Sequence, residues 1–408
     1  MSTASATPQP EVVLDITRLI GRFYDGKLPT GVDRVSLAYV AHFYDRARAK
    51  LHWRALNGLY SRNASKQIFD LLLRWNLDEI PRLKRLVFWG ALASVGNANL
   101  RGLWLFNTGH NGLEHARYER DVRWHQLRPL FFIHDLIPIT HPEFCRAQEA
   151  QKHAARINNM IAWGKGLIVN SRTTAHELRS YAEQNSLKLP PLLIAPLAPS
   201  VTSLASAEVS EANNLQAISS PPLQNYFLVL GTVEPRKNLS LLLDVWKTLL
   251  GKFGDAAPSL IVIGQAGWET QSVMDALSHS ATWQGKLQWH QTCSDADLSR
   301  WMKGARALLF PSFIEGYGLP AVEAMLAGVP VIASDLPVIR EIAADVPMLL
   351  NPRDASAWIE VIEDYSRPNS AARQAQLQRM PTLSHMTWEH HFELVDDFLQ
   401  ALTDDKLR

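Results

Sequence analysis

The sequence is poor in cysteine and has no long apolar run. Only Cys145 and Cys293 occur in 408 residues, and two isolated thiols fit a reducing cytoplasm better than a disulfide framework. No uncharged apolar run reaches the roughly 18 residues that span a bilayer. The first ten residues, MSTASATPQP, lack the basic and apolar regions of a signal peptide, so we expect a disordered tail there. These absences argue against a secreted disulfide-rich protein and against an integral membrane protein.

Several catalytic and binding motifs are also missing. The fourteen histidines show neither zinc-finger spacing nor HExxH, so we expect no metal. There is no GxGxxG, no Walker lysine motif and no GxSxG elbow. No basic–aromatic stripe indicates a nucleic acid partner. The pair His390-His391 falls on a final amphipathic pattern, where we expect both rings to be solvated.

The length and the charge distribution indicate two domains. A chain of 408 residues with 47% hydrophobic and 20% charged residues is globular and too long for one ordinary core. The net charge of +1 hides a basic first half and an acidic second half. A basic half could face anionic lipid or an anionic acceptor. It could equally reflect a plain difference between two domains.

Short apolar runs alternate with helical patterns in two series. This alternation predicts parallel sheets in α/β domains. The stretch 201–225 is rich in Ser, Ala and Asn and has little periodicity, so it reads as a linker. We therefore predict an α/β protein with two Rossmann-like, doubly wound domains that face each other across a cleft. The expected domains are 11–200 and 226–385, and the helix predicted over 386–408 packs back on the first domain.

The segment EGYGLPAVEAMLAGVPVIAS contains the most specific pattern. Glu315 and Glu323 lie eight residues apart with Gly316, Gly318 and Pro320 between them. The glycines allow a ligand to approach the backbone, and Pro320 suits the first turn of a helix. Loop amides and a helix N-terminus would face an anion, while carboxylates bind sugar hydroxyls. The segment therefore suggests a site for a nucleotide-activated sugar, although Glu323 alone, in the first turn, could simply complement the helix dipole.

Cations follow another predicted strand. Arg236 and Lys237 come after YFLVLG, and ligands of open α/β sheets bind at the carboxyl ends of strands. We predict that both side chains compensate the charge of a diphosphate; an ordinary surface Arg-Lys pair is the alternative. Asn238 is placed to cap the next helix.

Histidines end two strands of the first domain. His134 could donate a hydrogen bond to a substrate hydroxyl, or the His134-Asp135 pair could only hold its loop. His110 ends another strand and is a weaker candidate on the acceptor side. Gly31 and Arg34 are expected in the loop after the first strand, where a glycine lets the backbone approach phosphate.

Three segments together resemble glycosyltransferase family 4, the retaining enzymes of the GT-B fold: GTVEPRKNL (231–239), PSFIEGYGLPAVEAMLAGVPVIAS (311–334) and HDLIP (134–138). The resemblance implies front-face transfer from a nucleotide diphosphate sugar, with no metal, no cofactor and no enzyme nucleophile. It implies that Arg236 and Lys237 bind the diphosphate, that Glu315 lies by the sugar and that Glu323 holds the ribose. Relatives often carry two glycines where Thr30 precedes Gly31 here.

The resemblance also implies the composition of the site. The implied catalytic residues are His134, Glu315, Arg236 and Lys237. The implied donor-binding residues are Gly31, Gly231, Arg236, Lys237, Thr292, Cys293, Glu315, Gly316, Tyr317, Gly318, Leu319 and Glu323. The acceptor-side candidates are His110, Asp135 and Arg34.

The sequence thus predicts a cytoplasmic hexosyltransferase that extends a lipid-linked surface polysaccharide such as O-antigen or capsule. A mannose-type or rhamnose-type donor is favoured. The alternatives are a nucleotide-sugar 2-epimerase of the same fold and a non-catalytic glycan-binding subunit. The stretch PRLKRLVFWGAL (81–92) could place the protein at the inner face of the cytoplasmic membrane, or could be an amphipathic helix that packs on the core.

Overall fold

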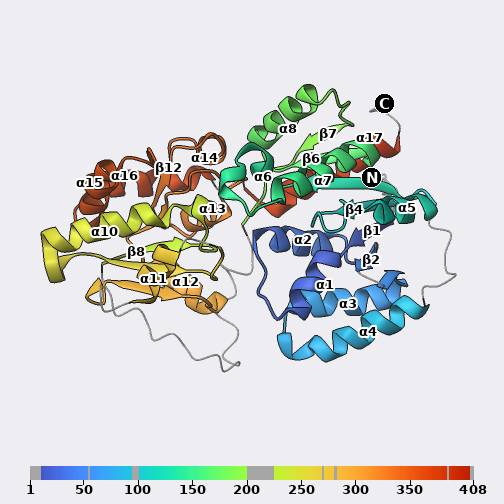
Figure 1. Cartoon of the computed structure of the whole chain (residues 1–408), viewed down its shortest axis with the longest axis horizontal. Helices are drawn as coiled ribbons and strands as arrows, with labels where there is room; N and C mark the ends of the chain where they lie inside the picture. Colours follow the sequence, from blue (N-terminus) through green and yellow to red (C-terminus); the bar gives the residue numbers. More distant parts are fainter. Residues whose placement is uncertain are drawn as a thin grey trace, which may run out of the picture. The chain divides into compact units, whose positions relative to one another are not determined.

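The computed structural model describes residues 11–53, 56–93, 101–199, 225–268, 271–279, 283–383 and 386–404. The predicted tail (1–10) and the predicted linker, apart from its last residue, lie outside this part. The chain divides into two compact units (Figure 1). The first is made of Met1–Ile139, Ala147–Pro196 and His391–Arg408, and the second of Thr140–Arg146 and Leu197–His390.

The first unit contains a seven-stranded sheet with the order β3-β2-β1-β4-β5-β6-β7. Neighbouring strands are parallel, except that β3 runs antiparallel to β2. The parallel expectation is therefore wrong for this edge strand. The strands are β1 (Val12–Asp15), β2 (Ala47–Trp53), β3 (Leu56–Leu59), β4 (Trp104–Asn107), β5 (Arg128–Ile133), β6 (Gly166–Val169) and β7 (Leu192–Ile194).

Helices cover both faces of this sheet, which explains why its central strands are apolar on both sides. Val13, Phe131 and Leu167 point to the face covered by α5, α7 and α8. The stretch 35–49 has helical spacing, but α2 ends at His42 and β2 begins at Ala47. The helices of this part are α1 (Thr17–Tyr24), α2 (Gly31–His42), α3 (Arg62–Arg74), α4 (Ile80–Ala93), α5 (Ala116–Trp124), α6 (Ile137–Thr140), α7 (Glu149–Trp163) and α8 (Arg172–Gln184).

The last helix, α17 (Trp388–Thr403), packs mainly within the first unit. Trp104 of β4 donates its indole N–H to Thr403 Oγ1 at 3.0 Å. Gly166 of β6 leaves room for the side chains of Phe398 and Leu402, which lie 3.0 Å from where its Cβ would be. His391 is fully buried, within hydrogen-bonding distance of the Pro196 carbonyl oxygen. The expectation of a solvated ring is wrong for His391, because this face of the helix covers the sheet.

The second unit contains a six-stranded, fully parallel sheet with the order β10-β9-β8-β11-β12-β13. Its strands are β8 (Tyr226–Leu230), β9 (Ser259–Ile263), β10 (Leu287–His290), β11 (Ala307–Phe310), β12 (Val331–Ser334) and β13 (Met348–Leu350). Its helices are α10 (Leu239–Phe253), α11 (Gln271–Ser278), α12 (Asp295–Gly304), α13 (Leu319–Leu326), α14 (Pro337–Ala343), α15 (Ala355–Ser366) and α16 (Ala371–Arg379).

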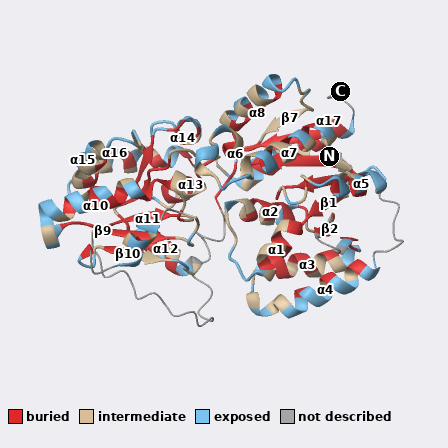
Figure 2. Cartoon of the chain, in the orientation of Figure 1, coloured by how far each residue is buried: buried red, intermediate tan, exposed pale blue. Residues whose placement is uncertain are grey.

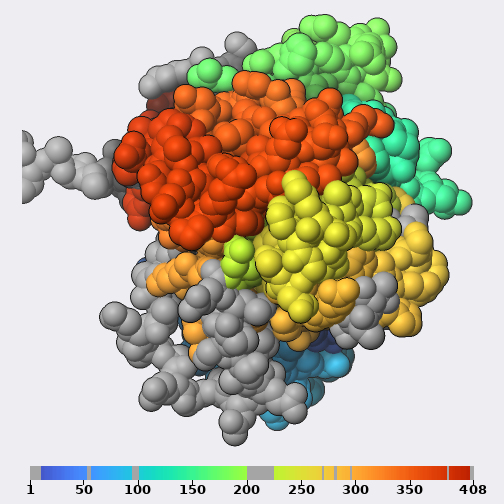
Figure 3. All heavy atoms as spheres, turned by 90° about the vertical axis from the view of Figure 1, so that its left-hand side faces the viewer, coloured from blue at the N-terminus to red at the C-terminus, as the bar shows by residue number. Residues whose placement is uncertain are grey.

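Two separate apolar clusters cover the faces of the second sheet. Leu228 and Ile261 point toward α12, α13 and α14, whereas Phe227 and Leu260 point toward α10, α11 and α15. The strands are buried while the outer sides of these helices are exposed (Figure 2). Helices α10 and α15 lie side by side on one face (Figure 3). The predicted pair of doubly wound α/β domains is confirmed.

In the part of the chain that the structure describes, no helix combines the length and the apolar character needed to cross a bilayer.

Candidate functional site

The candidate site of the second unit lies where the order of its strands reverses. The neighbours of β8 are β9, the next strand in the chain, and β11, which comes after two more crossovers. Ligands of doubly wound sheets bind at such a point, beside the carboxyl ends of the strands. The loop after β8 carries Arg236 and Lys237, and the loop after β11 carries Glu315. Glu315 thus contacts Arg236 and Lys237, although they lie 79 and 78 positions away in the sequence.

Glu315 is the centre of a buried ion cluster. Its carboxylate accepts hydrogen bonds from Arg236 Nη1 at 2.7 Å, from Lys237 Nζ at 2.5 Å and from Ser312 Oγ at 2.6 Å. The Glu315 side chain is only 7% exposed. Burial alone would raise its pKa, but Arg236, Lys237 and the Ser312 hydroxyl lower the pKa of Glu315 to about 2. The group is therefore ionised at neutral pH.

Arg236 ties the two loops together. Its Nη2 lies 2.6 Å from Glu234, in the same loop, and its Nη1 also donates to the Ile314 carbonyl at 3.3 Å. In the other direction, the Phe313 amide donates to the Arg236 carbonyl at 2.8 Å. Both predicted diphosphate-binding cations thus contact carboxylates of this unit. This network positions the cations, a role that the sequence pattern did not indicate.

Lys237 is buried together with its partner. Burial lowers the pKa of Lys237, and the nearby Glu315 carboxylate opposes that shift. Gly231, at the end of β8, has a φ of +130°, and a Cβ there would lie 3.5 Å from Lys237 Cε. A side chain at Gly231 would strain the backbone because of this positive φ, while its Cβ would make only an ordinary contact with the lysine. The structure thus favours glycine at position 231, next to Lys237.

The glycine-rich loop presents backbone rather than side chains. Gly318 precedes α13 with a φ of +100°, and a Cβ there would meet Ile339 at 2.7 Å. Tyr317 points inward and donates its hydroxyl to the Leu197 carbonyl at 2.7 Å, and burial raises its pKa. The ring of Tyr317 is thus occupied within the protein. Main-chain groups of Gly316, Tyr317 and Gly318 are what this loop offers to a ligand.

Two local expectations about helix ends are wrong. Helix α13 begins at Leu319, so Glu323 is its fifth residue, in the second turn rather than the first, and is only 8% exposed. A simple dipole role therefore explains Glu323 poorly. Asn238 occupies the position before α10, but its side-chain amide donates to the Pro311 and Pro352 carbonyls instead of capping the helix. It holds the loop after β11 in place.

Thr292 and Cys293 follow β10, at the same edge of the sheet but separated from β8 by β9. Thr292 is exposed, and Cys293 is half-buried with its thiol 3.5 Å from the Ser294 carbonyl oxygen. Ser294 then caps α12 by accepting a hydrogen bond from the Asp297 amide at 3.1 Å. These residues lie outside the ion cluster, at a part of the edge suited to another portion of an extended ligand.

The candidate residues of the first unit gather after β5 and β4. The rings of His110 and His134 lie 5.2 Å apart. His110 Nε2 contacts the Phe132 carbonyl at 2.5 Å, and His134 Nε2 contacts the Thr108 carbonyl at 2.7 Å. Asp135 accepts a hydrogen bond from the Ile137 amide at 3.1 Å. That contact matches the loop-holding role for Asp135.

Both histidines are neutral at physiological pH. Burial lowers the pKa of His134 to about 4, although the Thr108 carbonyl favours the protonated ring. Burial and the neighbouring histidines lower the pKa of His110 well below its usual range. A carbonyl only accepts, so Nε2 of His134 carries the proton and Nδ1 is left as an acceptor. His134 can therefore accept a hydrogen bond from a hydroxyl, whereas the sequence interpretation made it a donor.

Gly31 and Arg34 lie in α2 and not in the preceding loop, which corrects that expectation. Asp33 sets this helix start: its carboxylate accepts from the Thr30 amide at 2.8 Å and the Thr30 hydroxyl at 2.6 Å. The same carboxylate pairs with Arg18 at 2.7 Å. Sequence reasoning missed Arg18 and Asp33, although the spacing from Thr30 to Asp33 is a capping-box signal.

Comparison with known proteins relates the chain to sugar-transferring enzymes. Residues 211–377 match the family described as Glycosyl transferases group 1. The Escherichia coli serotype-specific mannosyltransferase WbdA is 27% identical over 65% of this chain and 32% of its own length. The E. coli O-antigen chain mannosyltransferase B is 33% identical over 41% of this chain and 43% of its own length. This chain thus spans about a third of WbdA and less than half of mannosyltransferase B.

Among solved structures, Anabaena HepE in complex with UDP has a similar fold. Its TM-score is 0.64 at 15% identity, and the match covers 97% of this chain and 100% of HepE. At this identity the similarity concerns the fold alone, which is GT-B.

Proposed function

We propose that this chain, whose residues 211–377 match the family described as Glycosyl transferases group 1, transfers a hexose or deoxyhexose from a nucleotide diphosphate sugar to a surface glycan. The observation that carries the proposal is the ion cluster of Arg236, Lys237 and Glu315 at the strand-order reversal of the second sheet. The mannosyltransferases to which this chain is similar favour a mannose-type donor and a polysaccharide such as O-antigen as the product.

In this proposal the second unit binds the donor. Arg236 and Lys237 compensate the charge that develops on the diphosphate as it leaves, and no metal is needed for that task. Glu315 holds the two cations in place and lies next to the sugar. The amides of Gly316–Gly318 bind sugar hydroxyls, and Glu323 binds the ribose.

The proposed transfer proceeds with retention of configuration. The bond between the anomeric carbon and the diphosphate breaks as the acceptor oxygen bonds to the same face of that carbon. The acceptor proton passes to the departing diphosphate oxygen, so no side chain acts as a nucleophile. Neutral His134 would accept a hydrogen bond from a sugar hydroxyl through Nδ1. The first unit is assigned to the acceptor, which we propose is lipid-linked.

A thermal-shift panel with UDP, GDP, dTDP and ADP tests the donor site first. A ligand that binds only the folded protein raises the melting temperature by mass action. We expect one nucleotide to stabilise the protein, GDP being the first choice, and the Lys237→Ala variant to lose that response. Stabilisation by none of the four nucleotides, or an equal response from Lys237→Ala, would refute the donor site.

Product analysis separates the proposal from its two alternatives. A 2-epimerase would convert the donor without any acceptor, whereas a transferase gives at most slow hydrolysis. A non-catalytic glycan-binding subunit would bind glycan but consume no donor. Acceptor-dependent release of nucleoside diphosphate supports the transferase, and anomeric NMR of the product reports retention.

A further inference from the structure

Helix α4 presents an exposed face of mixed aromatic and basic character. Phe88, Trp89 and Leu92 are 47%, 65% and 51% exposed, and they make up three of the seven large hydrophobic side chains that are exposed among the described residues. Arg82 and Arg85 are exposed on the same side of the helix. These five residues, here called the α4 face, recur at intervals of three and four positions and so form one continuous surface.

The α4 face is not needed to pack the helix. Leu83, Val87 and Ala91 are buried on the opposite side, and the Val87 carbonyl accepts a hydrogen bond from Tyr60 at 3.0 Å. A Cβ at Gly90 would lie 2.6 Å from the ring of Tyr60, so the helix is seated closely on its neighbours. The sequence left open whether 81–92 is a core helix or an interface helix. The structure shows a helix that packs on the core with one side and leaves aromatic residues exposed on the other.

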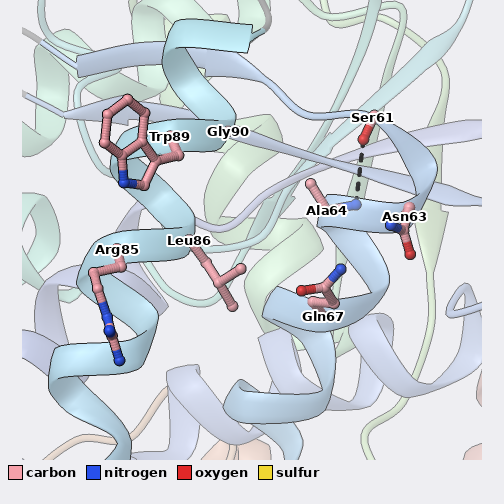
Figure 4. Close-up of a pocket in the computed structure, with 8 residues that line it drawn as sticks. All are labelled: Ser61, Asn63, Ala64, Gln67, Arg85, Leu86, Trp89 and Gly90. Atoms are coloured by element: carbon pink, nitrogen blue, oxygen red, sulfur yellow. Dashed lines mark hydrogen bonds between the residues drawn. The ribbon is translucent and has the colours of Figure 1, made fainter.

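A shallow groove of ≈ 210 Å³ borders the α4 face, between α3 and α4 (Figure 4). Arg85 and Trp89 line it from α4, and Asn63 and Gln67 line it from α3. An arginine and two side-chain amides supply donors that suit a phosphate group. A tryptophan beside them suits the boundary between head groups and acyl chains.

We propose that the α4 face docks on an anionic phospholipid membrane, with a lipid phosphate in the α3–α4 groove. The charge of the helix selects this occupant: α4 carries Arg82, Lys84 and Arg85 and no acidic residue. Basic residues near an anionic surface attract it, and Trp, Phe and Leu on the same helix insert into the interfacial region. The inference extends the proposed function, because it brings the first unit to the place where a lipid-linked acceptor resides.

Vesicle sedimentation of the full-length chain tests the proposal. We expect binding to phosphatidylcholine vesicles that contain phosphatidylglycerol, and little binding to phosphatidylcholine alone. The double variant Phe88→Ser/Trp89→Ser should bind about tenfold more weakly, because it removes two inserting side chains. Arg82→Glu/Arg85→Glu should also bind at least about tenfold more weakly, because it reverses two charges. Equal sedimentation with both vesicle types, no sedimentation with either, or unchanged binding of the variants would overturn it.

Trp124→Ser is the matched control. Trp124 is 84% exposed at the end of α5, which also carries several arginines, so its loss should leave vesicle binding unchanged. Light scattering tests whether a second copy of the chain covers the α4 face instead. If the wild type were a dimer and Phe88→Ser/Trp89→Ser a monomer, the face would serve self-association and the membrane proposal would be overturned. The nucleotide thermal shift should persist in every variant, so a failed membrane proposal is distinguishable from a failed donor site.

Discussion

The carboxyl edges of the two sheets use opposite electrostatics. In the second unit, Arg236, Lys237 and Glu315 are charged and partner one another in a buried cluster. In the first unit, the buried His134 and the half-buried His110 carry no charge, and each contacts a main-chain carbonyl. An ionic edge suits a ligand whose charge changes during the reaction, such as a diphosphate. A neutral edge of hydrogen-bonding groups suits hydroxyls, so the same architecture can divide donor and acceptor chemistry between its two units.

The largest expected effect removes a cation from the ionic edge. Lys237→Ala should lower the transfer rate by about 10²–10³-fold, because one group that compensates the leaving charge is lost. The measurement is acceptor-dependent release of nucleoside diphosphate. Lys247→Ala is the control, since Lys247 is a 65% exposed lysine of α10 that pairs with the surface residue Asp244. If Lys237→Ala were as active as Lys247→Ala, the cations of the second unit would not compensate the leaving charge.

Neutralising the central anion should mainly affect stability. Glu315→Gln leaves the buried Lys237 without its carboxylate and the half-buried Arg236 with Glu234 alone, and should cost about 3 kcal/mol at pH 7. The folded pKa of about 2 lies below the ordinary 4.5. The stabilisation is therefore complete above about pH 4.5 and is lost as the pH falls toward 2. Urea unfolding at a series of pH values should show wild type and variant converging in acid.

Asp335→Asn gives the reference for that experiment. Asp335 pairs with Arg340 at 2.5 Å, but both side chains are substantially exposed. An exposed pair of this kind contributes little to stability, because solvent screens the two charges. If Glu315→Gln cost no more than this surface substitution, the cluster would be electrostatically unimportant.

On the neutral edge, His134→Ala should lower the transfer rate by about tenfold through loss of one hydrogen-bond acceptor. Nucleotide affinity should not change. The lowered pKa of about 4 keeps the ring neutral above pH 5, so wild type and variant should have pH–rate profiles of the same shape from pH 5 to 8. The exposed His176 of the same unit provides the control. A step near pH 6.5 that disappears only in His134→Ala would contradict the neutral assignment.

The smallest expected effect concerns Tyr317. Tyr317→Phe leaves the Leu197 carbonyl without its donor and should destabilise the protein by about 1 kcal/mol. Nucleotide affinity should be retained, because the loop presents its backbone to the ligand. Urea unfolding and the thermal-shift response measure the two quantities separately. Strong loss of nucleotide binding would mean that the ring itself takes part.

The sequence predicted the fold class well because alternation of strands and helices is a local signal that repeats along the chain. It also singled out Arg236, Lys237 and Glu315 as residue types suited to the chemistry. It could not predict that these three side chains contact one another, since the contact depends on strand order. The burial of His391 was missed for the same reason: its face of α17 is set by distant strands.

Errors at helix ends had local causes. Glu323 was placed in a first turn because Pro320 was assumed to begin the helix, but the helix starts one residue earlier, after Gly318 with its positive φ. Gly31 was placed in a loop although Thr30 and Asp33 start a helix there. Asparagine is a common capping residue, but the side-chain amide of Asn238 donates hydrogen bonds to the Pro311 and Pro352 carbonyls in other loops.

The docking of α17 on the first sheet has a consequence for biosynthesis. Trp104 and Gly166 belong to strands that are translated before the second unit, yet Thr403, Phe398 and Leu402, which cover them, are translated after it. During synthesis, the face of the first sheet that α17 covers therefore stays exposed until the entire second unit has been translated. We expect nascent chains that stop before residue 388 to be captured by chaperones, whereas addition of the missing helix as a separate peptide should release them.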